Sequence, residues 1–123
     1  GAMAQDIIYY LQQIGNKCRM HGIIPVYATA TPINPHFIAN WSYITTPAVD
    51  WKEQQVLLNQ WIMSQQYAVD VASGMTDCYG LLMDEATTDG LHPDVLGKKL
   101  IGETISDYLL RTFPAKIFWP NNA

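Results

Sequence analysis

The sequence predicts an α/β fold, because segments with helical periodicity alternate with short apolar runs. The order is helix, strand, loop and helix, strand, loop, helix. The two runs are apolar almost throughout, which is typical of strands that are buried on both faces of a parallel sheet. We therefore expect two parallel strands that are covered by about three helices.

The first helix is expected at residues 5–21 and the first strand at residues 23–30. Apolar residues in the helix recur at spacings that place them on one face. They are Ile7, Leu11, Ile14 and Cys18. Gly22 supplies a C-terminal stop for the helix. Pro25 is expected at the start of the strand, because it has no N–H to donate to a ladder.

A second helix and strand are expected at residues 50–66 and 67–72, after an irregular loop at 31–49. Asp50 and Glu53 have the spacing of a capping box, which predicts the start of the helix. The apolar stripe of this helix contains Leu57, Leu58, Trp61 and Ile62.

The last helix is expected at residues 93–111, after a loop at 73–92 with one helical turn near 78–83. Pro93 suits the first position of a helix, where no backbone donor is needed. The buried face of this helix is predicted to contain Leu96, Leu100, Ile101, Ile105, Tyr108 and Leu109.

Composition narrows the classes of partner. The chain has 123 residues, 49% of them hydrophobic, which suits a globular domain. Its net charge of −4 argues against a nucleic acid or an anionic membrane surface as the main partner. No apolar run approaches the roughly 20 residues that span a bilayer. No residue spacing matches a metal site, and no cofactor is expected. Residues 1–3 resemble the scar of a cleaved expression tag.

The segment Thr88-Asp89-Gly90-Leu91-His92-Pro93-Asp94 carries the clearest chemistry. Gly90 permits a tight turn after Asp89. Pro93 favours an extended backbone at His92, so the ring projects from a loop at the start of a helix. The positive end of the helix disfavours a charged imidazole, and Asp89 can accept from Nδ1–H and fix the tautomer. A neutral, oriented imidazole suits a general base, so Asp89 and His92 are candidate catalytic residues.

This motif, at the start of the last helix of an α/β pattern, resembles the final motif of the SGNH hydrolases, also called GDSL lipases or esterases. Three segments follow the order of that family: residues 5–30, 50–72 and 87–111. The resemblance implies a three-layer, flavodoxin-like fold, of which residues 4–123 form only the C-terminal part, with the last two of five strands. It also implies ester hydrolysis through an acyl-enzyme, in which His92 is the general base and Asp89 orients it.

Two motifs of the family are absent from the sequence, namely the Gly-Asp-Ser nucleophile motif and the Gly-x-Asn-Asp motif of the oxyanion hole. Ser73 follows a predicted strand but lacks the Gly-x-Ser-x-Gly pattern of a nucleophile elbow. By the resemblance, the nucleophile and the oxyanion hole belong to an N-terminal segment outside this chain. We therefore expect the isolated chain to be inactive.

The predicted loop at 31–49 contains three aromatic residues, Phe37, Trp41 and Tyr43. They form either a packed loop or a wall of a substrate cleft, since this loop follows a parallel strand at the ligand-binding end of the sheet. The resemblance is compatible with lipid, acetylated-sugar and small-molecule esters. The alternative function is a non-catalytic module that binds carbohydrate or protein through this loop and an open strand edge. An open edge also predicts a homodimer.

Overall fold

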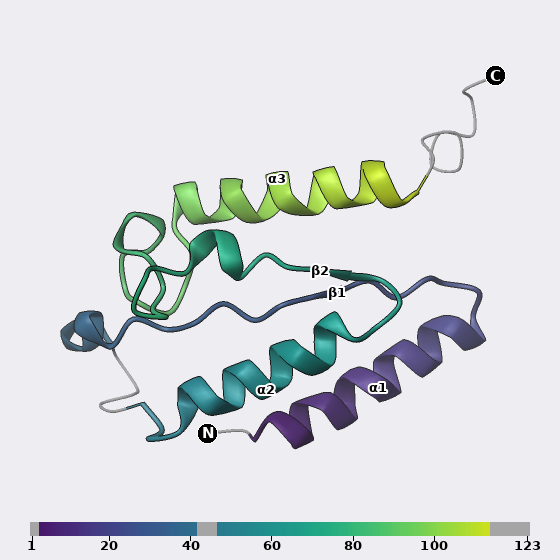
Figure 1. Ribbon diagram of the computed structural model, residues 1–123, viewed down its shortest axis with the longest axis horizontal. Coiled ribbons are helices and arrows are strands. Elements are labelled where there is room, and N and C mark those ends of the chain that lie inside the picture. Colours follow the sequence, from purple (N-terminus) through teal and green to yellow (C-terminus); the bar gives the residue numbers. More distant parts are fainter. Residues whose placement is uncertain (1–2, 42–46, 114–123) are drawn as a thin grey trace.

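The computed structural model describes residues 3–41 and 47–113, which form three layers (Figure 1). Helix α3 (Val95–Thr112) covers one face of a small sheet, and α1 (Ala4–Met20) and α2 (Trp51–Met63) cover the other. Each helix runs in the direction opposite to that of the strands. The predicted α/β architecture, with two parallel strands and three helices, is therefore confirmed.

The sheet consists of β1 (Tyr27–Ala28) and β2 (Ala68–Val69), which pair in parallel. The backbone N–H groups of Tyr27 and Thr29 both donate toward β2, at 3.0 and 3.1 Å. Alternate residues of a strand face its two neighbours, so the N–H and C=O of Ala28 face the other edge. The described part of the chain places no strand at that edge.

Both strands are shorter than the predicted runs at 23–30 and 67–72. Pro25 has the same parity as Tyr27 and has no N–H, so the ladder does not extend toward it. At the other end, Asn59 on α2 satisfies the backbone of Ala30. Its Oδ1 accepts from the N–H of Ala30 at 2.8 Å, and its Nδ2 donates to the C=O at 2.9 Å. Ala30 has the parity of Ala28, so Asn59 occupies the outer edge of β1 at this residue, where a further strand would otherwise pair.

The apolar core has two clusters, one on each side of the sheet. The cluster beneath α1 and α2 contains Ala4, Tyr27, Leu58 and Ile62. The cluster beneath α3 contains Met75, Leu82 and Ala86, with Leu100 and Ile101 packed against it. Strand β2 contacts both α2 and α3, so the small sheet joins the two sides.

The buried face of α1 differs from the predicted one. Ile14 is 57% exposed, and Gly15 faces the sheet instead. A Cβ at Gly15 would collide with the hydroxyl of Tyr27, which donates to the backbone C=O of Leu11 at 3.2 Å. The buried face of α1 includes Gly15, and a pattern of hydrophobic residues does not identify a buried glycine. The predictions for the other helices were wrong at Leu57 and Leu96, which are 51% and 42% exposed.

The starts of α2 and α3 also differ from the predictions. Asp50 is the N-cap residue of α2, but its carboxylate accepts from the side chain of Gln54 at 3.0 Å, so no capping box forms. Helix α3 begins two residues after Pro93. Asp94 caps it by accepting from the N–H of Gly97 at 3.0 Å.

Three short 3₁₀ helices lie in the loops: η1 (Pro35–Asn40), η2 (Ser73–Met75) and η3 (Asp84–Ala86). The helical turn predicted near 78–83 was wrong. A non-helical turn occupies that segment. The backbone N–H of Asp77 closes this turn by donating to the C=O of Leu81 at 2.8 Å. The helical turns lie on either side of it.

No helix in the described residues is long and apolar enough to cross a membrane. In the same residues, no cluster of three or more His, Cys, Asp or Glu side chains could hold a metal ion. Cys18 and Cys78 are free thiols.

Candidate active site

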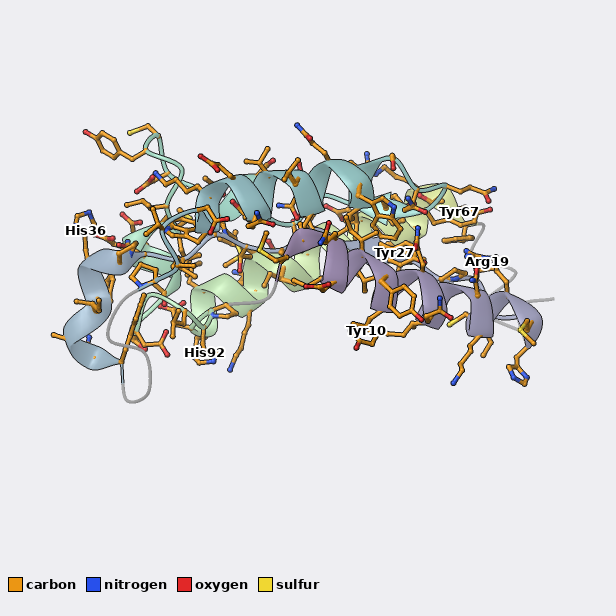
Figure 2. The ribbon with its side chains drawn as sticks, turned by 90° about the horizontal axis from the view of Figure 1, so that it is seen from below. Tyr10, Arg19, Tyr27, His36, Tyr67 and His92 are labelled. Atoms are coloured by element: carbon orange, nitrogen blue, oxygen red, sulfur yellow. The ribbon has the colours of Figure 1, made fainter. Side chains whose placement is uncertain are left out.

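The candidate site lies in the loop between η3 and α3. Figure 2 shows His92 at one end of the molecule, far from Arg19 and Tyr67 at the other. Tyr67 directly precedes β2, so His92 lies beyond the carboxyl ends of the strands. This is the end of a parallel sheet where α/β proteins bind their ligands.

Asp89 and His92 form a hydrogen-bonded pair. The Nδ1 atom of His92 lies 2.6 Å from Oδ2 of Asp89. The other carboxylate oxygen, Oδ1, accepts from the backbone N–H groups of Leu91 and His92, both at 2.8 Å. The ring of His92, the N–H of His92 and the N–H of Leu91 together lower the pKa of Asp89 well below its usual value. Asp89 is thus a carboxylate at neutral pH.

The pair leaves one imidazole nitrogen available for chemistry. Because ionised Asp89 accepts at Nδ1, the proton of a neutral ring resides there, and Nε2 carries the lone pair. The side chain of His92 is 79% exposed, and Nε2 has no hydrogen-bond partner in residues 3–41 and 47–113. An exposed, oriented Nε2 can accept a proton from a nucleophile of another segment.

Thr87 holds the loop around this pair, although the sequence did not single it out. It is 4% exposed. Its Oγ1 accepts from the N–H of Gly90 at 2.9 Å and donates to the C=O of His92 at 2.8 Å. One hydroxyl therefore joins the turn after Asp89 to the residue that carries the imidazole. A threonine two residues before an Asp-Gly pair is the sequence signal that could have indicated this role.

Gly90 meets two separate demands at the centre of the loop. Its φ is +78°, a left-handed conformation that side chains disfavour. A Cβ at this position would also lie 2.3 Å from the C=O oxygen of Asn34 and 2.8 Å from Cβ of Phe37. The glycine predicted for a tight turn is therefore also needed for the close approach of another loop.

Asn34 connects the loop after β1 to the loop of the pair. Its side chain is 1% exposed, and its Nδ2 donates to the C=O of Leu82 and to Oδ1 of Asp84, both at 2.8 Å. Its Oδ1 accepts from the N–H of His36 at 3.1 Å. Its own backbone N–H donates to the C=O of Gly90 at 2.8 Å. Asn34 therefore joins three loops, a role that the sequence analysis did not assign to it.

The predicted aromatic residues take different positions. The indole N–H of Trp41 donates to the backbone C=O of Asp89, and its ring lines a cavity of about 640 Å³. Phe37 lies against Gly90 and is not among the residues that line this cavity. Tyr43 lies outside the described residues. Trp41 thus bonds to the loop of the pair and also lines the cavity, while its predicted place in a substrate cleft stays a prediction.

Ser73 lies at the start of η2, where its hydroxyl donates to the carboxylate of Asp70. Its backbone N–H donates to the same carboxylate at 3.1 Å. No hydrogen bond joins Ser73 to a histidine within the described segments. This geometry gives Ser73 no imidazole base.

Fold and site together describe an α/β chain with a carboxylate–imidazole pair at the carboxyl end of its sheet. A solved structure reported as that of a putative platelet activating factor from Streptococcus pneumonia matches it with a TM-score of 0.61 and 22% identity. The match covers 81% of this chain and 48% of the other, so this chain spans about half the length of the structure it matches. At this identity the likeness shows the fold. No protein-family model and no curated protein matches the sequence.

Proposed function

We propose that residues 4–123 form the C-terminal part of a serine hydrolase of the esterase or lipase type, which acts on carboxylic esters. The observation that carries this proposal is the 2.6 Å hydrogen bond between His92 and Asp89, which leaves Nε2 exposed. The motif resembles that of the SGNH hydrolases, and the match to about half of a longer solved chain agrees with a partial domain.

In the proposed mechanism, Nε2 of His92 takes the proton of a serine hydroxyl as its oxygen attacks the ester carbonyl. The tetrahedral intermediate then expels the alcohol, which takes this proton from His92, and an acyl-enzyme remains. Water attacks the acyl-enzyme by the same route, so serine is regenerated and the acid is released. Asp89 remains ionised throughout and stabilises the imidazolium that forms twice.

The nucleophilic serine and the oxyanion-hole donors are proposed to come from an N-terminal segment outside this chain. The outer edge of β1 at Ala28, at which the described residues place no strand, supports this, because further strands of a complete sheet would pair there. By itself the chain is expected to hydrolyse no ester.

The test is to express the chain together with the segment encoded upstream of it and to follow hydrolysis of a short-chain nitrophenyl ester. Replacing His92 with alanine should lower kcat by about 10²–10⁴-fold, the usual contribution of general-base catalysis. His36→Ala, at an exposed histidine of η1, is the matched control and should leave kcat unchanged. Full activity of His92→Ala, or an upstream segment without a Gly-Asp-Ser motif, would contradict the proposal.

The open edge of β1 also favours a second candidate, a non-catalytic module that binds another protein. Carbohydrate binding through the aromatic loop has less support, because the N–H of Trp41 is already bonded to Asp89. If the chain is such a module, the protein expressed with its upstream segment should hydrolyse no ester, so the same assay distinguishes the two functions.

A further inference from the structure

A second cavity, of about 600 Å³, lies at the end of the molecule opposite to His92. Figure 2 shows Arg19, Tyr27 and Tyr67, which line it, toward that end. Its walls are the last turn of α1, the segment before β1 and the turn between α2 and β2. The volume lies within the range of small-molecule sites.

This cavity lies on the paired side of β1. The backbone N–H of Tyr27 donates to the C=O of Tyr67 at 3.0 Å, so two lining residues are joined across the edge that β1 shares with β2. A further strand at Ala28 would lie on the opposite side of β1 from Tyr67. The polar residues of the turn between α2 and β2 therefore lie away from the edge that is proposed to receive the upstream segment.

Arg19 brings a positive charge to the cavity. Its Nη2 donates to Oδ1 of Asn16 at 3.0 Å, and it forms no ion pair with the described residues. Among the described residues that line the cavity, none is an aspartate or a glutamate. A guanidinium has five N–H donors in a planar arrangement that matches a carboxylate. The charge of Arg19 therefore favours a ligand with a carboxylate group.

Two glutamine side chains bring acceptors to the same cavity. Nε2 of Gln65 donates to the C=O of Trp61 at 3.1 Å, and Nε2 of Gln66 donates to the hydroxyl of Tyr67 at 3.4 Å. Within residues 3–41 and 47–113, no group donates to Oε1 of either glutamine. These oxygens can accept from hydroxyl groups, which a simple fatty acid lacks.

We propose that this cavity binds a small carboxylate that also carries hydroxyl groups, such as a sugar acid. The carboxylate pairs with Arg19, and the hydroxyls donate to Oε1 of Gln65 and of Gln66. The site is far from His92 and takes no part in the proposed hydrolysis. Either proposal can therefore fail without the other.

The test is NMR titration of the 123-residue chain with gluconate, sorbitol and hexanoate, which are open-chain molecules of equal carbon number. Sorbitol lacks the carboxylate and hexanoate lacks the hydroxyls, so gluconate should bind about tenfold or more tightly than either. The side-chain N–H signals of Arg19, Gln65 and Gln66 should shift. The indole N–H of Trp41, which is bonded to the His92 loop, is the internal control. Unchanged signals with gluconate, or equal affinity for sorbitol or hexanoate, would overturn the proposal.

Two basic residues in the last turn of α1 provide matched variants. Arg19 lines the cavity, whereas Lys17 does not. Arg19→Gln should weaken gluconate binding about tenfold or more and remove the preference for gluconate over sorbitol, because the carboxylate loses its partner. Lys17→Gln changes the net charge equally and should alter gluconate binding less than twofold. Equal effects of the two variants would indicate attraction by net charge alone and would overturn the site. Urea unfolding of both would verify that they are folded.

Discussion

The His92 loop and the α1–β1 region differ in how far their side chains are bonded or covered by the rest of the chain. In the loop, the buried side chains of Asn34 and Thr87 bond to several backbone groups and fix the orientation of the pair. By contrast, Ile14 on α1 and Ile23 and Ile24 before β1 are each more than half exposed. The chain thus arranges the proposed base without help but leaves part of its apolar surface uncovered.

This contrast shows that the orientation of the proposed base and the covering of the apolar surface depend on different parts of the molecule. A loop held by its own hydrogen bonds needs no second segment to orient an imidazole. A strand edge at which the described residues place no strand, and exposed isoleucines before β1, are both typical of surfaces that another chain or segment covers. The following variants test the two regions separately.

The largest expected effect is that of Asp89→Asn in the active protein, which is the chain expressed together with its upstream segment. Asparagine retains an oxygen for the N–H groups of Leu91 and His92, but its amide would face Nδ1 and favour the wrong imidazole tautomer. The kcat for a nitrophenyl ester should decrease by about 10²–10⁴-fold.

Asp94→Asn is the matched control, because asparagine caps a helix as well as aspartate does. In the isolated chain, ¹⁵N NMR should show the Nδ1–H tautomer of His92 in the wild type and its loss in Asp89→Asn. An unchanged tautomer would contradict the orienting role of Asp89.

The next effect concerns the junction at Asn34. Asn34→Ala removes three side-chain hydrogen bonds in a buried position and should lower the free energy of unfolding by about 2–4 kcal/mol in urea. Asn40→Ala, at an exposed residue with one bond of 3.3 Å, should cost about 0.5 kcal/mol. Similar costs for both variants would show that the loop is not held at Asn34.

A smaller effect is expected at the β1 side, where we predict that the isolated chain dimerises. Introducing Ile23→Lys and Ile24→Lys should weaken the dimer at least tenfold by sedimentation equilibrium, because charges on a covered apolar surface are costly. Val95→Lys, at a residue that is 85% exposed on α3, is the control and should leave the dimer intact. A wild-type chain that stays monomeric would contradict the prediction.

The smallest effect is a pH dependence of stability. The pKa of Asp89 is lower in the folded chain than its usual value near 4, so the pair stabilises the fold above pH 4. This contribution should be lost as the pH falls below 4 toward the lowered pKa. Between pH 5 and pH 2 the free energy of unfolding should decrease more for the wild type than for Asp89→Asn. Parallel decreases would show that Asp89 is not coupled to folding.

Local patterns in the sequence predicted the order of elements and the pair, whereas long-range contacts determined most of the rest. Asp89 and His92 are three residues apart, so turn chemistry alone predicts their proximity. The backbone of Ala30 at the outer edge of β1 is bonded to Asn59, which is far away in the sequence. The buried role of Asn34 likewise depends on partners about 50 residues away, which no local spacing reveals.

The two demands on Gly90 have a consequence for the recognition of distant relatives. Shortening Phe37 to alanine would keep the Cβ that a new side chain meets, and it would relieve neither the contact with the backbone oxygen of Asn34 nor the positive φ. No single second change repairs both, so a replacement here is hard to reach by stepwise evolution. A glycine after the aspartate is therefore a better marker of this loop than overall identity, and its absence in an aligned chain would indicate a different loop path.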